Sequence, residues 1–159
     1  NSTRLGPVPA LKRAEKALIH IIITDGDLRR ELKEKMDMLT FSEEYRSLVE
    51  KVYRMGDFSE EIPVGELSQE LLLESDEEAL GLLAEISLME IDLEEKRRIF
   101  DDCINCIRRH KLEQEIKAVD HKIQISVNQG LKDDVKELLR YKNDLLKERG
   151  KFSSFQGIS

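Results

Sequence analysis

The feature of this 159-residue sequence that most limits its fold is the placement of its helix-disrupting residues. The three prolines are Pro7, Pro9 and Pro63, and the stretch between Asp92 and Gly130 contains neither proline nor glycine. Proline breaks a helix interior and glycine weakens it. The chain beyond Pro63 can therefore form long uninterrupted helices, provided that its apolar residues recur at helical spacing.

Five segments before this stretch have the apolar period of an amphipathic helix. The first begins near Ala10, carries Leu11, Ala14, Leu18, Ile21 and Ile22, and ends at Thr24, with Gly26 in a left-handed conformation. Asp27 is expected to cap the second helix, and the Thr40 to Glu43 capping-box spacing to open the third. The remaining expected ranges are 27–36, 43–56, 64–72 and 76–89.

The stretch that follows predicts one helix of roughly 36 residues, capped by Asp92, which is unusually long for a globular domain. Its apolar stripe slips by one residue across 108–111, which predicts two different packing partners. The second half, 112–127, matches the segment 131–146 in length, so the two are expected to form an antiparallel hairpin around Asn128–Gly130. The predicted stripes are Phe100, Cys103, Ile104 and Ile107, then Leu112, Ile116, Val119, Ile123 and Val127, facing Leu131, Val135, Leu138, Leu139, Lys142, Leu145 and Leu146.

The expected fold is thus all-α, because no alternating strand pattern occurs. It divides into a linker remnant (1–9), a helical bundle (10–111), a helical hairpin (112–150) and a C-terminal tail (151–159). The tail carries Phe152, Phe155 and Ile158, and it could fold back, fray or dock on another protein. The polar start is expected to be an excised interdomain piece and the tail a true chain end.

Composition excludes several classes of protein. The longest apolar-rich run, 17–23, contains His20 and is too short to span a membrane. Two cysteines are too few for a disulfide framework, which favours a cytoplasmic location.

The formal charge is -7, and residues 57–90 contain eleven acidic and no basic side chains. That acidic segment is either a solvated face or a surface for a basic partner.

No motif predicts a catalytic residue, a metal site or a cofactor. Asp25 and Asp27 resemble a carboxylate pair, but helical periodicity and a capping role account for them. Cys103, Cys106 and His110 have zinc-like spacing, yet one helix separates the first and last by about 10 Å of rise, too far for tetrahedral zinc. There is no phosphate-binding loop. The basic cluster 108–111 lacks an aromatic platform, so little or no direct nucleic-acid binding is expected.

Three motifs in order carry a family resemblance. They are Ala14-Glu15-x2-Leu18-Ile19, Phe41-x3-Tyr45-Arg46-x-Leu48, and the run from Asp101-Asp102-Cys103 through Arg108-Arg109 to Glu115-Ile116. Together with the closing hairpin, they resemble the C-terminal helicase-interaction domain of bacterial DNA primase over about 11–150. The resemblance implies a non-catalytic domain whose hairpin grips the N-terminal domain of the hexameric replicative helicase. The resemblance also implies that this domain recruits primase to the replication fork and modulates the activity of the helicase.

The resemblance and the expected exposure select the partner-binding residues. These are Asn128, Gln129, Leu131, Tyr141, Leu145, Phe152 and Phe155. Alone, the chain is expected to be a monomer. Two alternatives stay open: the N-terminal domain of the replicative helicase itself, and a free-standing helical adaptor or oligomeriser, which would form a stable dimer.

Overall fold

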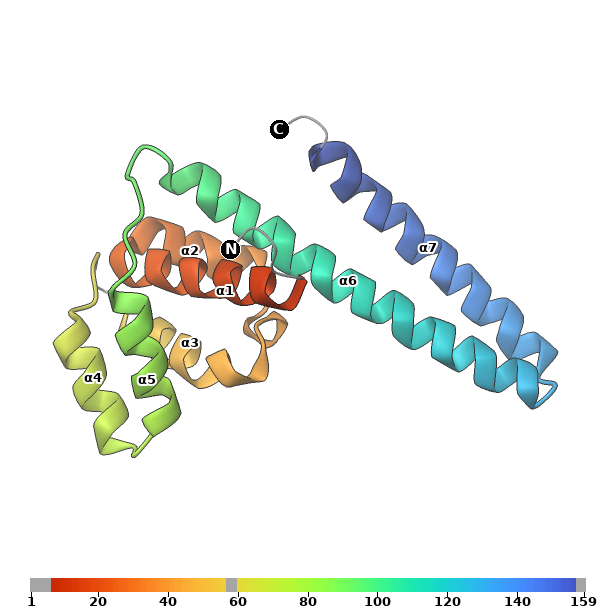
Figure 1. The fold of residues 1–159 in the computed structure, drawn as a ribbon, viewed down its shortest axis with the longest axis horizontal. Helices are drawn as coiled ribbons and strands as arrows, with labels where there is room; N and C mark the ends of the chain where they lie inside the picture. Colours follow the sequence, from red (N-terminus) through yellow and green to blue (C-terminus); the bar gives the residue numbers. More distant parts are fainter. Residues whose placement is uncertain (1–6, 57–59, 157–159) are drawn as a thin grey trace. The chain divides into compact units, whose positions relative to one another are not determined.

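A computed structural model of the chain describes the backbone of residues 7–56 and 60–156 and the side chains of 10–56 and 60–152. Every regular element in these residues is helical, which confirms the all-α prediction (Figure 1). The elements are α1 (Pro7–Thr24), α2 (Gly26–Lys35), the short 3-10 helix η2 (Met38–Thr40), α3 (Glu43–Met55), α4 (Val64–Leu73), α5 (Glu77–Ser87), α6 (Lys96–Asn128) and α7 (Lys132–Gln156).

The chain forms two compact units, residues 1–107 and residues 108–159. The first is a helical bundle made by α1 to α5 and the first three turns of α6, and the second is the antiparallel hairpin of the remaining part of α6 with α7. The boundary lies within α6, next to the basic cluster where the apolar stripe of the sequence slips. The predicted bundle, long helix and closing hairpin are therefore all present.

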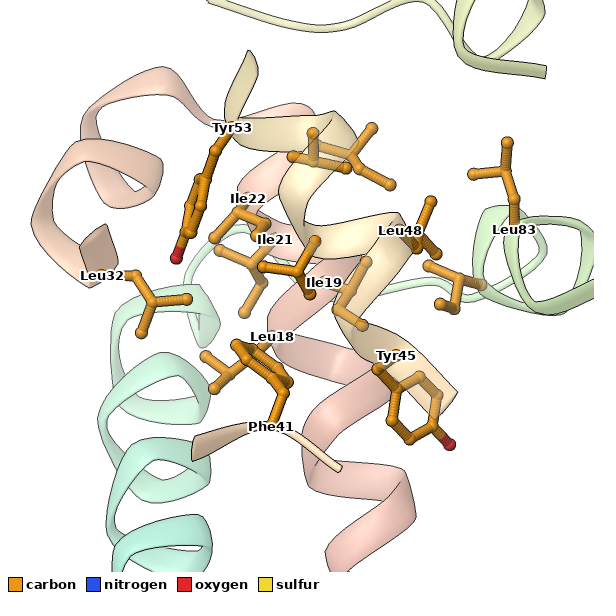
Figure 2. Packing of buried hydrophobic residues seen from close by; sticks show 14 of the residues in the cluster. Leu18, Ile19, Ile21, Ile22, Leu32, Phe41, Tyr45, Leu48, Tyr53 and Leu83 are labelled. Atoms are coloured by element: carbon orange, nitrogen blue, oxygen red, sulfur yellow. The ribbon is translucent and has the colours of Figure 1, made fainter. Parts of the chain in front are cut away.

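The bundle has one continuous apolar core around α1. Leu18, Ile21 and Ile22 are fully buried, and they belong to the same apolar cluster as Phe41 and Tyr45 (Figure 2). The core also contains Leu28, Leu32, Met36, Tyr45, Leu48 and Val52, at helical spacing in the second and third predicted helices, whereas Met55 of the same stripe is half-buried. Ala79, Leu83 and Ile86 of α5 are also in the core, whereas Leu82 and Met89 are only half-buried.

The junction between α1 and α2 differs from the prediction. Asp25, not Asp27, caps α2, because its carboxylate accepts a hydrogen bond from the Leu28 amide at 3.0 Å. Gly26 is the first residue of α2 and has no positive φ, so it does not end α1 in a left-handed conformation. The chain thus passes between the two helices through the single residue Asp25, which also pairs with Lys96 at 3.1 Å.

The start of α3 is capped from another helix. Ser42 is the N-cap residue, but its side chain makes no capping hydrogen bond, so the predicted Thr40–Glu43 capping box is wrong. Thr40 instead belongs to the 3-10 helix. The fully buried carboxylate of Glu15 accepts hydrogen bonds from the Ser42 amide at 2.6 Å and from the Ser42 hydroxyl at 2.9 Å. An anion at this end also complements the helix dipole.

Three predicted helix ends are displaced by three residues or more. The first helix begins at Pro7 rather than near Ala10, since proline is tolerated in a first helical turn. Asp92 lies in the turn before α6, where its carboxylate accepts from the Glu94 amide at 2.9 Å, and the helix begins only at Lys96. At the other end α7 continues through Gly150 to Gln156, because one glycine weakens a helix without ending it. Residues 1–6 of the predicted linker and 157–159 of the predicted tail lie outside the described residues.

Candidate protein-interaction surface

The two helices of the hairpin are joined by a tight turn that depends on the left-handed backbone conformation of one residue. Gly130 has a φ of +72°, the left-handed conformation in which glycine carries no steric cost. The Leu131 amide donates to the Ser126 carbonyl at 3.0 Å, and the Gly130 amide donates to the Val127 carbonyl at 3.1 Å. These two bonds form a Schellman motif, which ends α6 and reverses the chain direction. Asp133 and Asp134 then stabilise the positive end of α7.

A small apolar core holds the hairpin together. Leu112, Ile116 and Val119 of α6 are buried against Leu145 of α7. Four half-buried side chains extend this core along the hairpin, namely Ile123, Leu138, Leu146 and Phe152. A core of this size leaves much of the apolar surface of the two helices uncovered.

Ion pairs cross between the helices on one side of the hairpin. Lys142 pairs with Asp120 at 2.7 Å, and the Arg149 guanidinium pairs with Glu113 at 3.0 Å. On α7 this side also contains Leu139, which is three residues before Lys142 and therefore on the same helical face. We call this the ion-paired side.

A groove of about 480 Å³ runs along the other side. Its uncharged lining is Ile125, Ser126, Leu138 and Tyr141, and its charged lining is Lys122, Asp134 and Glu137. Ile125 is 43% exposed and Tyr141 46%, so apolar surface faces solvent. Tyr141 donates a hydrogen bond to Glu115 at 3.0 Å, which orients its ring and raises the pKa of its hydroxyl. We call this the grooved side.

The predicted partner-binding residues fall into three groups. Asn128 and Gln129 at the turn are exposed, as are Leu131 (43%) and Tyr141. Leu145 is only 6% exposed, so its predicted accessibility is wrong: it lies in the α7 stripe that faces α6. Phe152 is half-buried against the hairpin core, and the side chain of Phe155 lies outside the described residues.

The sequence pattern did not predict that the Ser126 side chain is buried and that the side chains of its two neighbours are exposed. Ser126 is 9% exposed, while Val127, predicted to face α7, is 53% exposed, and Ile125 is 43% exposed. Leu139, also predicted inward, is 49% exposed. The signal for Ile125 was present, because residues two positions apart on a helix point about 200° apart, so Ile125 cannot share the inward stripe that contains Ile123.

The residues that resembled metal sites have other roles in the structure. The Asp25 carboxylate caps α2 and pairs with Lys96, whereas Asp27 is exposed and pairs with Arg30. Cys103 and Cys106 form no disulfide and are half-buried against the bundle core. Burial raises the pKa of the Cys103 thiol to about 12, which makes it a poor nucleophile and metal ligand. Across residues 10–56 and 60–152, no three His, Cys, Asp or Glu side chains are grouped to hold a metal ion.

Two further findings bear on the surface. Among the described helices, none combines the length and the apolar character that crossing a bilayer requires. No protein-family model, no curated protein and no solved structure matches the chain.

Proposed function

We propose that this chain is the non-catalytic, helicase-binding domain of a bacterial DNA primase. In this proposal the hairpin binds the N-terminal domain of the hexameric replicative helicase, and the bundle modulates helicase activity. The order of the three sequence motifs and the hairpin after them support the family. The observation that supports a binding role is that five large apolar side chains of the hairpin are 43–53% exposed.

The bundle also exposes large apolar side chains, six among its described residues, and five of them are more exposed than any in the hairpin. The hairpin makes up about a third of the sequence, yet it carries five of the eleven exposed large apolar side chains among the described residues. They are Ile125, Val127, Leu131, Leu139 and Tyr141. Ile125 and Tyr141 lie on the grooved side and Leu139 on the ion-paired side. Exposed apolar side chains with a polar rim are typical of a protein-binding surface.

The ring symmetry of the helicase would strengthen a weak contact. One hairpin buries little area, so its affinity for a single helicase subunit is expected to be modest. A ring presents several identical sites, which raises the effective concentration of each bound primase and keeps it at the fork. Primer synthesis would belong to other domains of the primase.

Calorimetric titration of the chain into the N-terminal domain of the cognate helicase tests this proposal. We expect saturable binding in the micromolar range or tighter, about -8 kcal/mol. Sedimentation of the chain alone separates the proposal from the adaptor alternative, since we expect a monomer where an adaptor forms a stable dimer. Absence of heat and of co-sedimentation with the helicase domain would contradict the helicase-binding role.

A further inference from the structure

The seven cationic side chains of α7 fall into two groups. Lys142 and Arg149 pair with acidic residues of α6. The other five are exposed and make no side-chain hydrogen bond or ion pair with any described residue, so they do not hold the hairpin together. They are Lys132, Lys136, Arg140, Lys147 and Lys151.

These five residues lie in one row on the face of α7 that points away from α6. Successive residues of a helix are about 100° apart, which places all five within an arc of roughly 100°. Lys136 and Arg140 are each two positions from Leu138, which packs towards α6. Residues two positions apart point about 200° apart, so the row faces the opposite direction. We call these five residues the cationic row.

The cationic row is long and regularly spaced. Lys132, Lys136 and Arg140 follow one another at intervals of four residues, which is about 6 Å of rise for each step. From Lys132 to Lys151 the row extends about 28 Å along the helix. A nucleic-acid strand carries one negative charge per nucleotide, and an extended strand spaces its successive phosphates at a similar distance. A strand that lies along α7 can therefore bring a phosphate to each cation.

The composition of the row favours phosphates over a protein or a lipid surface. Protein interfaces have an apolar centre from which lysine is depleted, whereas four of these five residues are lysines and none is apolar. Helices that bind membranes insert an apolar face, but the apolar face of α7 packs on α6. Contacts to a nucleic-acid backbone are made by lysine and arginine without an apolar core.

The residues beside the row favour one strand over a duplex. The flank of the row towards the grooved side carries the acidic residues of α7, namely Asp133, Asp134, Glu137, Asp144 and Glu148. A second strand would find no matching row of cations on α7, and on this flank it would meet carboxylates.

We propose that the cationic row binds the phosphate backbone of single-stranded nucleic acid. Binding is independent of base sequence, because the row offers no aromatic side chain on which bases can stack. The sequence pattern around 108–111 predicts little nucleic-acid binding, but the structure shows which cations of α7 are left unpaired. This proposal goes beyond the proposed function and does not depend on helicase binding.

Fluorescence anisotropy with a labelled oligothymidylate tests the proposal in the full chain. An oligomer of about 20 nucleotides exceeds the roughly 4–16 nucleotides that single-strand sites cover. We expect saturable binding at low salt, with a slope of log K against log salt of about -3.5 when all five cations contact phosphates. A duplex of the same length should bind more weakly.

A matched pair of double variants tests the row itself. Lys136→Glu with Arg140→Glu reverses two charges of the row, and Lys117→Glu with Lys122→Glu reverses two exposed charges of α6. Both change the net charge equally, so a difference in affinity comes from where the charges lie. We expect the first to weaken binding by about tenfold or more and to reduce the salt slope by about 1.4, and the second to weaken binding by less than about threefold.

A neutral variant guards against loss of folding. Lys136→Gln with Arg140→Gln removes the same two charges without adding carboxylates near Asp133 and Asp144. With helicity unchanged by circular dichroism, we expect a loss of affinity between those of the two reversed variants.

Several results would overturn the proposal. Equal losses from the two reversed variants would mean that net charge alone drives binding. Duplex binding as tight as that of the single strand would contradict the preference for one strand. Displacement of the strand by polyglutamate as readily as by unlabelled oligothymidylate would assign the row to acidic protein segments instead. Absence of binding by the unmodified chain at low salt would refute the site, and none of these measurements depends on the helicase.

Discussion

Gly56, at the end of α3, lies directly against the buried guanidinium of Arg29 from α2. The Gly56 carbonyl accepts a hydrogen bond from Arg29 Nη1 at 2.8 Å, and a Cβ at Gly56 would lie 2.7 Å from that side chain. Arg29 cannot move aside easily, because it also donates to the carbonyls of Ile22, Ile23 and Glu60. Two of these are among the last carbonyls of α1, so one side chain caps α1 and fixes the end of α3.

Gly56→Ala is therefore expected to destabilise the bundle by about 1–3 kcal/mol, since the added methyl overpacks a site that cannot relax. Gly81 in α5 provides the control, because a Cβ there would meet nothing within 4 Å. Gly81→Ala should stabilise the protein by roughly 0.5–1 kcal/mol through helix propensity. Urea denaturation measures both changes. Equal effects of the two substitutions would show that Arg29 does not restrict Gly56.

The buried Glu15 should tolerate loss of its charge better than loss of its hydrogen bonds. Burial raises the pKa of this carboxyl, so its ionised form is costly, but both oxygens accept from Ser42. In Glu15→Gln the amide oxygen can accept from the Ser42 amide while the amide nitrogen donates to the Ser42 hydroxyl. We expect a change within about 1 kcal/mol for Glu15→Gln and a loss of about 1–3 kcal/mol for Glu15→Ala.

Equilibrium denaturation distinguishes these two variants. If Gln is as destabilising as Ala, the charge itself would be what holds the start of α3. Comparable stability of all three proteins would mean that Ser42 obtains equivalent hydrogen bonds from water.

Stability should fall in acid partly because of Glu31. Bidentate hydrogen bonds from Arg97, at 2.6 and 2.7 Å, lower the pKa of this carboxyl to about 2, against 4.5 for the free side chain. The lowered pKa means that the stabilisation is fully present above about pH 4.5 and is lost as the pH falls from there towards 2. Glu31→Gln should therefore lower the melting temperature at pH 7 and flatten its dependence on pH in that window.

The control is Glu34→Gln, an exposed carboxyl of the same helix with no side-chain partner among the described residues. It should follow the unmodified protein at every pH. Parallel pH profiles for Glu31→Gln and the unmodified protein would contradict the role assigned to the Arg97 pair.

The Cys103 thiol should react slowly in the folded protein. With a pKa of about 12, only about one thiol in ten thousand is ionised at pH 8, and only the thiolate is alkylated. Iodoacetamide labelling followed by mass spectrometry should show modification of Cys103 at least about 100-fold slower in buffer than in urea. Similar rates in the two conditions would mean that Cys103 is not buried against the bundle core.

Much of the fold was predictable because it depends on local periodicity. The absence of proline after Pro63, the stripes ending at Gly56 and the turn at Gly130 locate the helices, and the stripe slip beyond Ile107 coincides with the division of the chain into two units. Helix caps were harder to predict. The start of α3 is capped by Glu15, a residue of another helix, and no pattern in the sequence near Ser42 predicts this contact.

The candidate surface was only partly predictable for a similar reason. A helical stripe gives the inward face to within about one residue, and at the turn that uncertainty exchanged Ser126 with Val127. Leu145 was expected both in the stripe that faces α6 and, from the resemblance, among the partner-binding residues, and the structure confirms only the first, because Leu145 completes the hairpin core. Which side of the hairpin carries ion pairs depends on contacts such as Lys142 with Asp120, which join residues of different helices.

The central claim is that the hairpin binds the helicase and the bundle folds without it. A chain truncated after Lys111 tests this most directly, by calorimetric titration against the helicase N-terminal domain and by thermal unfolding of the truncated chain. We predict cooperative unfolding of a helical protein that no longer binds the helicase domain, while the full chain binds. Binding by the truncated chain with undiminished affinity would contradict the account.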